Sequence, residues 1–194
     1  QQLGATYIAK MDPKDPAHVT SSPVRIVTPE YAWNAAIAEG PNVTLRDGKL
    51  YLMFSGSGVG KTYTTGLAVA DAAGSDLTDP ASWTALNYPI QKSGPFNGEM
   101  QLGTGHGMWS EDEDGNQVYV FHAYATKNLG SVNATGRDMF VRRVHWAADG
   151  MPVFDMSSSE ELASKTVSVT VKVADDTVTV DKTDLSKALA SAKQ

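Results

Sequence analysis

Short apolar-rich runs, separated by polar and glycine-containing turns, recur along the chain up to about residue 155 and are typical of β-strands. Runs of this kind occupy residues 6–11, 41–58, 62–72, 116–125 and 137–150. Asp47-Gly48 interrupts the second run, as a hairpin turn pair does. Helical patterns occur weakly in 29–40 and more clearly in 182–194. The chain is therefore predicted to be all-β over most of its length.

Two of these runs repeat one another at a spacing of 67 residues. DGKLYLMFSG begins at Asp47 and DGNQVYVFHA at Asp114, and Glu39 and His106 lie at the same spacing upstream. Units of several antiparallel strands that recur every 40 to 70 residues or so are typical of β-propeller blades. A β-sandwich is the alternative, although it does not by itself predict a repeat. Because a propeller needs at least about four blades, we expect the C-terminal part of a larger propeller.

The pattern changes after Phe154. Residues 155–165 are polar, and 166–182 alternate valine with polar residues, as a half-exposed hairpin or linking strand does. Thr183 or Asp184 can cap a following helix, which is either the start of a small extracellular helical module or an ordinary helix. We therefore predict propeller blades over 1–155, a linker and β segment over 156–182, and a helical segment over 183–194.

Composition excludes several classes of function. The net charge is −6, and no basic block is present that would bind nucleic acid. The absence of cysteine excludes thiol catalysis, iron–sulfur clusters and zinc ribbons. No apolar run approaches the roughly 20 residues of a membrane span.

The segment SGSGVGKT, residues 55–62, resembles a phosphate-binding loop. However, three residues separate Gly56 from Gly60, whereas the phosphate-binding motif requires four. The segment that follows, TYTTGLAVADA, is β-branched and strand-like, and a phosphate-binding loop must open a helix. We expect a connection between two strands, with Lys61 in solvent and no bound nucleotide.

Five residues are candidates for binding or chemistry. Glu39 begins the first strand of its repeat unit, which lines the central channel in a propeller, and it either acts as a general acid or caps a turn. His106 occupies the equivalent place among three glycines and either binds a metal or substrate or forms a structural hydrogen bond. Trp33 and Phe54 lie near Glu39 in the predicted fold and can contact a sugar or pack in the core. Arg137 faces the channel or pairs with the aspartate that follows it.

These motifs, in this order, resemble glycoside hydrolase family 43, the five-bladed propeller enzymes. EGPNVTLRDGKLYLMFSGSG is similar to the segment around the general acid of that family. GTGHGMW and the closing DGMPVF are similar to its last blade. The resemblance covers about residues 5–155 and is strongest to the α-L-arabinofuranosidase-like branch.

The resemblance implies an inverting glycosidase acting on arabinose- or xylose-containing plant polysaccharide. Glu39 would protonate the leaving oxygen, and His106 would hold a Ca²⁺ or other ion at the base of the channel. The catalytic base and the pKa-tuning aspartate of the family lie in earlier blades, and neither Asp12 nor Asp15 matches them. The chain alone is therefore expected to be inactive.

The same resemblance implies which partners the chain has and where it acts. Its partners would be the missing N-terminal blades and the polysaccharide. The protein would be secreted or associated with the cell wall. A non-catalytic carbohydrate-binding propeller is the alternative.

Overall fold

The computed structural model describes residues 4–125, 136–161, 171–174 and 177–180. The chain divides into two compact units, residues 1–155 and 156–194. The strands of the first unit are β1 (Thr6–Ile8), β2 (Met11–Asp12), β3 (Asp15–Val19), β4 (Val24–Val27), β5 (Ala38–Arg46), β6 (Lys49–Gly56), β7 (Thr64–Asp71), β8 (Thr84–Ala85), β9 (Gly94–Phe96), β10 (Glu99–Glu111), β11 (Gln117–Tyr124), β12 (Asp138–Arg143), β13 (His145–Trp146) and β14 (Pro152–Val153). Its two short 3₁₀ helices are η1 (Ala32–Asn34) and η2 (Pro80–Ser82).

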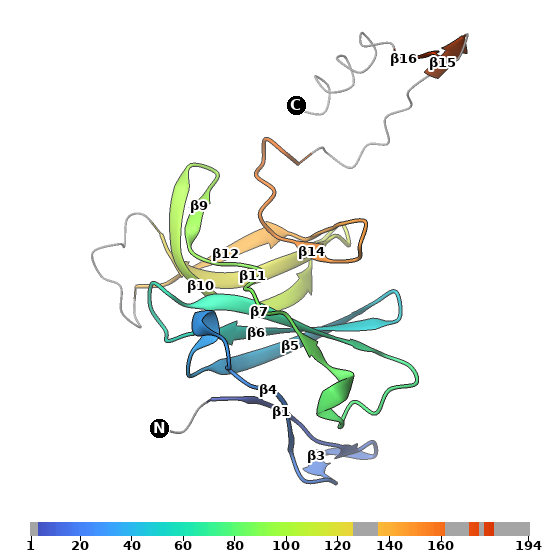
Figure 1. The fold of residues 1–194 in the computed structure, drawn as a ribbon. Coiled ribbons are helices and arrows are strands. Elements are labelled where there is room, and N and C mark those ends of the chain that lie inside the picture. The colour runs from blue at the N-terminus through green and yellow to red at the C-terminus, as the bar shows by residue number, and fades with distance from the viewer. Residues whose placement is uncertain (1–3, 126–135, 162–170, 175–176, 181–194) are drawn as a thin grey trace. The chain divides into compact units, whose positions relative to one another are not determined.

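Two four-stranded antiparallel sheets form the body of this unit. Their strand orders are β5-β6-β7-β8 and β12-β11-β10-β9. In Figure 1 the β5–β8 sheet lies between the β1–β4 pair and the β9–β12 sheet. The all-β prediction is confirmed, and successive sheets side by side are the arrangement of neighbouring propeller blades.

The weak helical pattern of residues 29–40 produces only the single turn η1 before β5 begins at Ala38. The side chain of Asn34 accepts a hydrogen bond from the Tyr31 N–H at 2.9 Å and closes this turn. Ala36 follows with a φ of 73°, a conformation that an α-helix does not contain. A helix over this segment was therefore a wrong prediction.

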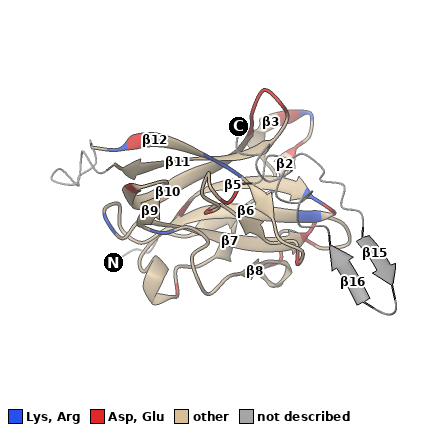
Figure 2. Ribbon diagram, turned by 90° about the horizontal axis from the view of Figure 1, so that it is seen from above, with Lys and Arg blue, Asp and Glu red and all other residues tan. Residues whose placement is uncertain are grey.

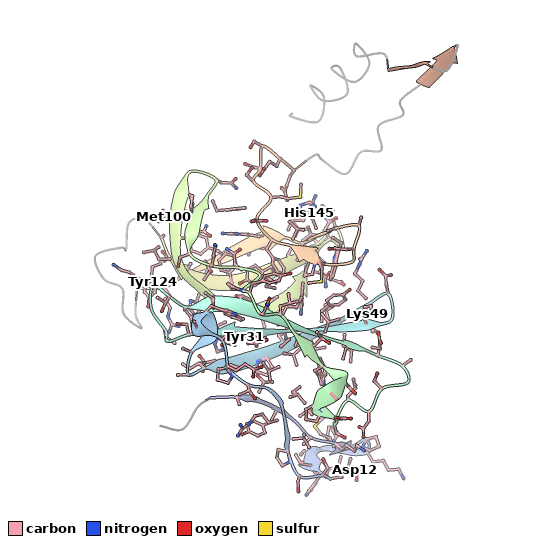
Figure 3. The ribbon with its side chains drawn as sticks, in the orientation of Figure 1. Asp12, Tyr31, Lys49, Met100, Tyr124 and His145 are labelled. Carbon is pink, nitrogen blue, oxygen red and sulfur yellow. The ribbon has the colours of Figure 1, made fainter. Side chains whose placement is uncertain are left out.

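Strand β6 is buried on both faces and separates two hydrophobic clusters. Leu52 and Phe54 pack with Ile26 and Val27 on the side of the β1–β4 pair. Met53, between them, points the other way and joins a cluster with residues of β11, since successive side chains of a strand face opposite sides. Side chains from the sheets fill the space between them (Figure 3). A strand buried on both faces is expected in the middle of a stack of sheets.

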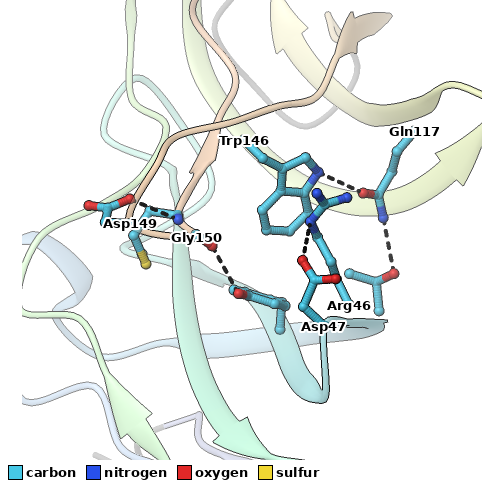
Figure 4. A network of polar contacts seen from close by, with 9 residues as sticks. Arg46, Asp47, Gln117, Trp146, Asp149 and Gly150 are labelled. Atoms are coloured by element: carbon cyan, nitrogen blue, oxygen red, sulfur yellow. Dashed lines mark hydrogen bonds and ion pairs between the residues drawn. The ribbon is translucent and has the colours of Figure 1, made fainter.

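A network of polar contacts joins the two sheets (Figure 4). The Tyr51 hydroxyl donates to the Gly150 carbonyl at 2.9 Å. The Gln117 amide donates to Thr44 Oγ1 at 3.0 Å and accepts from Trp146 Nε1 at 3.2 Å. These contacts link the β5–β6 hairpin to β11 and to the β13–β14 turn, and they fix one sheet against the other.

The segment 55–62 joins antiparallel strands β6 and β7. Ser55 and Gly56 still belong to β6, and β7 begins at Thr64. The loop therefore opens a strand and not a helix, and it lacks the aligned amides that hold a phosphate. Lys61 is exposed. The predicted strand connection is confirmed.

Acidic and basic residues are interspersed over the sheets (Figure 2). Within the ranges that the structure describes, no helix is long and apolar enough to cross a membrane.

In the second unit β15 (Val171–Ala174) pairs with β16 (Thr177–Val180) in antiparallel register, where the valine alternation predicts paired strands. The predicted helix over 183–194 lies outside the described residues. The predicted boundary at residue 182 lies there as well.

Candidate functional site

Glu39 lies at the start of β5, where the strand is distorted. It pairs with Ser55 of β6, and the register then shifts between Glu39 and Asn42. Gly40 has a φ of 59°, which favours glycine. Irregularities of this kind re-aim side chains at strand ends, and they are frequent next to active sites. The Glu-Gly-Pro segment thus holds the half-buried Glu39 at a bend of β5.

His106 lies in β10 at a second irregularity. The register of β10 shifts on both sides of Gly105, and His106 itself has a φ of 51°, which is uncommon for a residue other than glycine. Its backbone N–H donates to Ser55 Oγ at 2.6 Å. A Cβ on Gly40 would lie 3.0 Å from His106 Cε1. Gly40 therefore allows both the bend of β5 and the approach of the imidazole.

Tyr63 joins Glu39 to His106. Its hydroxyl donates to Glu39 Oε1 at 2.7 Å and lies 3.2 Å from His106 Nδ1. A phenol has one proton, so the contact with His106 must be donated by Nδ1–H, which leaves the lone pair on Nε2. Burial raises the pKa of Tyr63; the Ser55 hydroxyl lowers it, and Glu39 raises it again. The hydroxyl thus stays a donor at neutral pH.

His122 and Arg137 extend this group. The His122 ring stacks on Tyr63 at 5.5 Å between centroids and lies 6.3 Å from the His106 ring. Arg137 Nη1 is 2.9 Å from His122 Nε2. Burial, then the positive charge of Arg137 and the electrostatic interaction with His106, lower the pKa of His122 to about 4. His122 is therefore neutral above pH 5 or so, and its Nε2 accepts from Arg137.

An open hollow of about 590 Å³ lies against this group. His106, His122 and Arg137 supply polar atoms to its lining, and Met108 and Met139 supply apolar surface. Its volume is within the range of ligand pockets. Glu39 is not part of the lining and connects to it through Tyr63 and His106.

The two aromatic candidates have the surroundings of core residues. Phe54 is 1% exposed and offers no surface to a sugar. Trp33 is half-buried, packs on Phe54 at 6.0 Å between ring centroids, and donates from Nε1 to the Asn87 carbonyl at 2.9 Å. A Cβ on Gly66 would lie 2.6 Å from the Trp33 ring, so the indole fits against the β7 backbone. In this structure both rings pack the β5–β8 sheet.

The described residues do not form a metal centre by themselves. Among them, no group of three or more His, Asp or Glu side chains gathers closely enough to hold an ion. Calcium takes six to eight oxygen ligands. His106 brings a nitrogen, with Tyr63 and His122 beside it. Ca²⁺ at His106 thus stays a prediction and would need oxygen ligands from beyond the described residues.

Tyr63 and His122 are the site residues that sequence reasoning missed. Tyr63 stands in a Thr-rich segment that is typical of an ordinary strand. His122 lies on a strand face shared with Val118 and Val120, and a polar residue on an otherwise apolar face is the only local signal. Most of their partners lie 15 or more residues away along the chain.

A comparison with protein families identifies the family of the chain. The model of glycosyl hydrolases family 43 matches residues 1–152. The chain belongs to this family. Glu39, Tyr63, His106 and His122 all lie inside the matched region.

Curated relatives of the chain include arabinofuranosidases. An extracellular exo-α-(1→5)-L-arabinofuranosidase of Streptomyces avermitilis is 32% identical over 154 residues, which cover 76% of this chain and 31% of that protein. Alpha-L-arabinofuranosidase 43 of Humicola insolens is 31% identical over 73% of this chain and 30% of that protein. The chain therefore spans about a third of the length of these relatives.

Solved structures show the same fold. The α-L-arabinofuranosidase of Lactobacillus brevis superposes with a TM-score of 0.69 and 30% identity, over 77% of this chain and 46% of that one. A thermostable family-43 glycoside hydrolase gives a TM-score of 0.63 at 24% identity, over 76% of this chain and 46% of that one. The expected fold, part of a β-propeller, is confirmed.

Proposed function

We propose that the chain is the C-terminal part of an inverting glycosidase that cleaves arabinofuranosyl or xylosyl linkages in plant polysaccharides, with Glu39 as its general acid. The observation that carries the role of Glu39 is the 2.7 Å hydrogen bond from Tyr63 to Oε1, which holds the carboxyl group at the bend of β5. The names of its relatives support the substrate class. The names of two relatives also include the word extracellular, which supports a secreted protein.

An inverting mechanism needs a second carboxylate, about 6.5 to 9.5 Å from the acid, to activate a water. At Glu39 the described contacts come from Tyr63, and the neighbouring groups are imidazoles and a guanidinium. The base would come from blades outside this chain. The 194-residue chain alone is therefore proposed to be inactive.

Two open apolar faces support the need for further blades. Met108 pairs with Val120 of β11, and Val120 with Val141 of β12, so the three side chains share one face of the last sheet. Met108 is 49% exposed and Val141 53%. On β5, Val43 and Leu45 are 46% and 64% exposed. We propose that the missing N-terminal blades cover both faces, as neighbouring sheets do in a propeller.

The test replaces Glu39 by Gln in the complete protein. The amide keeps the size of the side chain but cannot protonate a leaving oxygen, so turnover of an arabino-oligosaccharide should fall by about 10²-fold or more. Glu111→Gln, at the exposed end of β10, is the matched control and should keep full activity. Circular dichroism should show that both variants fold.

Unchanged turnover of the oligosaccharide and of an aryl α-L-arabinofuranoside in Glu39→Gln would refute Glu39 as the acid. A complete wild-type protein that binds the oligosaccharide without cleaving it would favour the non-catalytic carbohydrate-binding propeller. Activity of residues 1–194 alone would refute the proposed need for further blades.

A further inference from the structure

We infer that Tyr63 is a positioning residue for Glu39, which orients the acid through the hydrogen bond to Oε1 and leaves Oε2 to face the leaving group. This inference rests on the proposed function. It concerns a side chain that no sequence motif singled out. The hydroxyl of Tyr63 contacts two residues that are 67 positions apart on neighbouring strands, Glu39 near the start of β5 and His106 in the middle of β10.

The direction of the two hydrogen bonds supports this role. His106 Nδ1–H donates to the Tyr63 oxygen, and the Tyr63 proton is donated to Glu39 Oε1. A proton that Glu39 gives to a substrate must therefore leave from Oε2. Once Glu39 has lost that proton, the bond from Tyr63 becomes charge-assisted and stabilises the carboxylate that forms.

The ring of Tyr63 is held in place from several sides. Tyr63 is 0% exposed, and its ring stacks on His122 with an interplanar angle of 8°. A Cβ at Gly105 would lie 2.3 Å from Tyr63 Cδ1, so the β10 backbone lies directly against the ring. A phenol fixed by packing is preorganised, which is what accurate placement of a catalytic acid requires.

Tyr63→Phe in the complete protein removes the hydroxyl and keeps the ring. Tyr119→Phe is a matched control, because Tyr119 is also 0% exposed and its hydroxyl, 2.6 Å from Thr65 Oγ1, does not contact Glu39. The measurement is kcat and KM with two arabinofuranosides, an oligosaccharide whose alcohol leaving group needs a proton and a dinitrophenyl glycoside whose leaving group does not.

For Tyr63→Phe we expect kcat on the oligosaccharide to fall by about 10- to 100-fold with little change in KM. The fall on the dinitrophenyl glycoside should be only a few-fold, because its departure needs no acid. Tyr119→Phe should lower both activities equally or not at all.

Equal losses on the two substrates in Tyr63→Phe would overturn the positioning role and leave a structural one. The activity of Glu39→Gln separates this outcome from failure of the proposed function. If Glu39→Gln is inactive on the oligosaccharide and Tyr63→Phe behaves like Tyr119→Phe, only the role of Tyr63 is refuted. If Glu39→Gln is fully active, the proposed function itself fails.

Discussion

A single methyl group at Gly105 should disturb the stability of the protein. Gly105 lies in β10 against the ring of Tyr63, and a Cβ there would be 2.3 Å from Cδ1 and 2.5 Å from Cε1. Carbon atoms in contact are normally about 3.5 to 4.0 Å apart. In Gly105→Ala the ring or the β10 backbone must therefore move by about 1 Å. Tyr63 is fully buried, so the ring has little room to move.

The expected cost follows from overpacking. Extra methyl groups in a well-packed core destabilise by about 1 to 3 kcal/mol. Because a domain of 150 to 250 residues loses about 2 to 4 °C in Tm per kcal/mol, the melting temperature should fall by about 2 to 12 °C. A displaced Tyr63 hydroxyl should also loosen its bond to Glu39, so activity of the complete protein should fall with stability.

Urea denaturation measures the free energy of unfolding of Gly105→Ala, and scanning calorimetry measures its melting temperature. Gly94→Ala is the matched control, because Gly94 lies in β9 of the same sheet and a Cβ there meets nothing within 4 Å. Its free energy of unfolding should stay within about 0.5 kcal/mol of the parent value. Equal stabilities of Gly105→Ala and Gly94→Ala would refute the reasoning that β10 lies directly against the Tyr63 ring.

Two further predictions concern His122 and Arg142. The pKa of His122 is about 4 in the folded protein, whereas its ordinary value is 6.5. As the pH falls, the unfolded chain therefore binds a proton at His122 before the folded protein does. The free energy of unfolding should consequently decrease between pH 6.5 and pH 4. In urea denaturation at several pH values, His122→Gln should make the free energy of unfolding less dependent on pH. The same pH dependence in the variant and in the parent protein would contradict this role of His122. Arg142 is 5% exposed and donates to the Phe154 carbonyl and to the amide oxygen of Gln101. Arg142→Lys should lower the free energy of unfolding by about 2 to 4 kcal/mol in urea denaturation. A decrease below about 0.5 kcal/mol would contradict the importance of these hydrogen bonds.

The strands and their turns could be predicted from sequence because their signals are local. Asp47-Gly48 is a turn pair, and both residues have positive φ, as a tight hairpin requires. The apolar runs on either side of this turn located β5 and β6 in the same way. Each of these features depends only on neighbours within a few positions of the chain.

The glycines of GTGHGMW show where sequence reasoning ends. Three glycines around a histidine indicate a close approach to the backbone, but not which group approaches it. A Cβ at Gly103 would lie 2.1 Å from the Gly60 carbonyl oxygen, and one at Gly107 would lie 2.2 Å from the Tyr119 ring. Each of these neighbours comes from another strand or loop. No local pattern shows which distant side chain a glycine accommodates, so Tyr63 was missed for the same reason.

The 67-residue repeat explains why Glu39 and His106 come together. Strands β5 and β10 lie side by side, so equivalent positions of successive sheets face each other. Asn42 Oδ1 accepts a hydrogen bond from the Trp109 N–H at 2.7 Å, and these residues are also 67 positions apart.

Glu39 and His106 are also 67 positions apart, and the Tyr63 hydroxyl contacts both of them. If a preceding blade continues the stack, the residue that corresponds to Glu39 in its inner strand should lie next to Glu39 on the other side. A catalytic base supplied from outside this chain is therefore expected at the position of an inner strand that corresponds to Glu39 and His106.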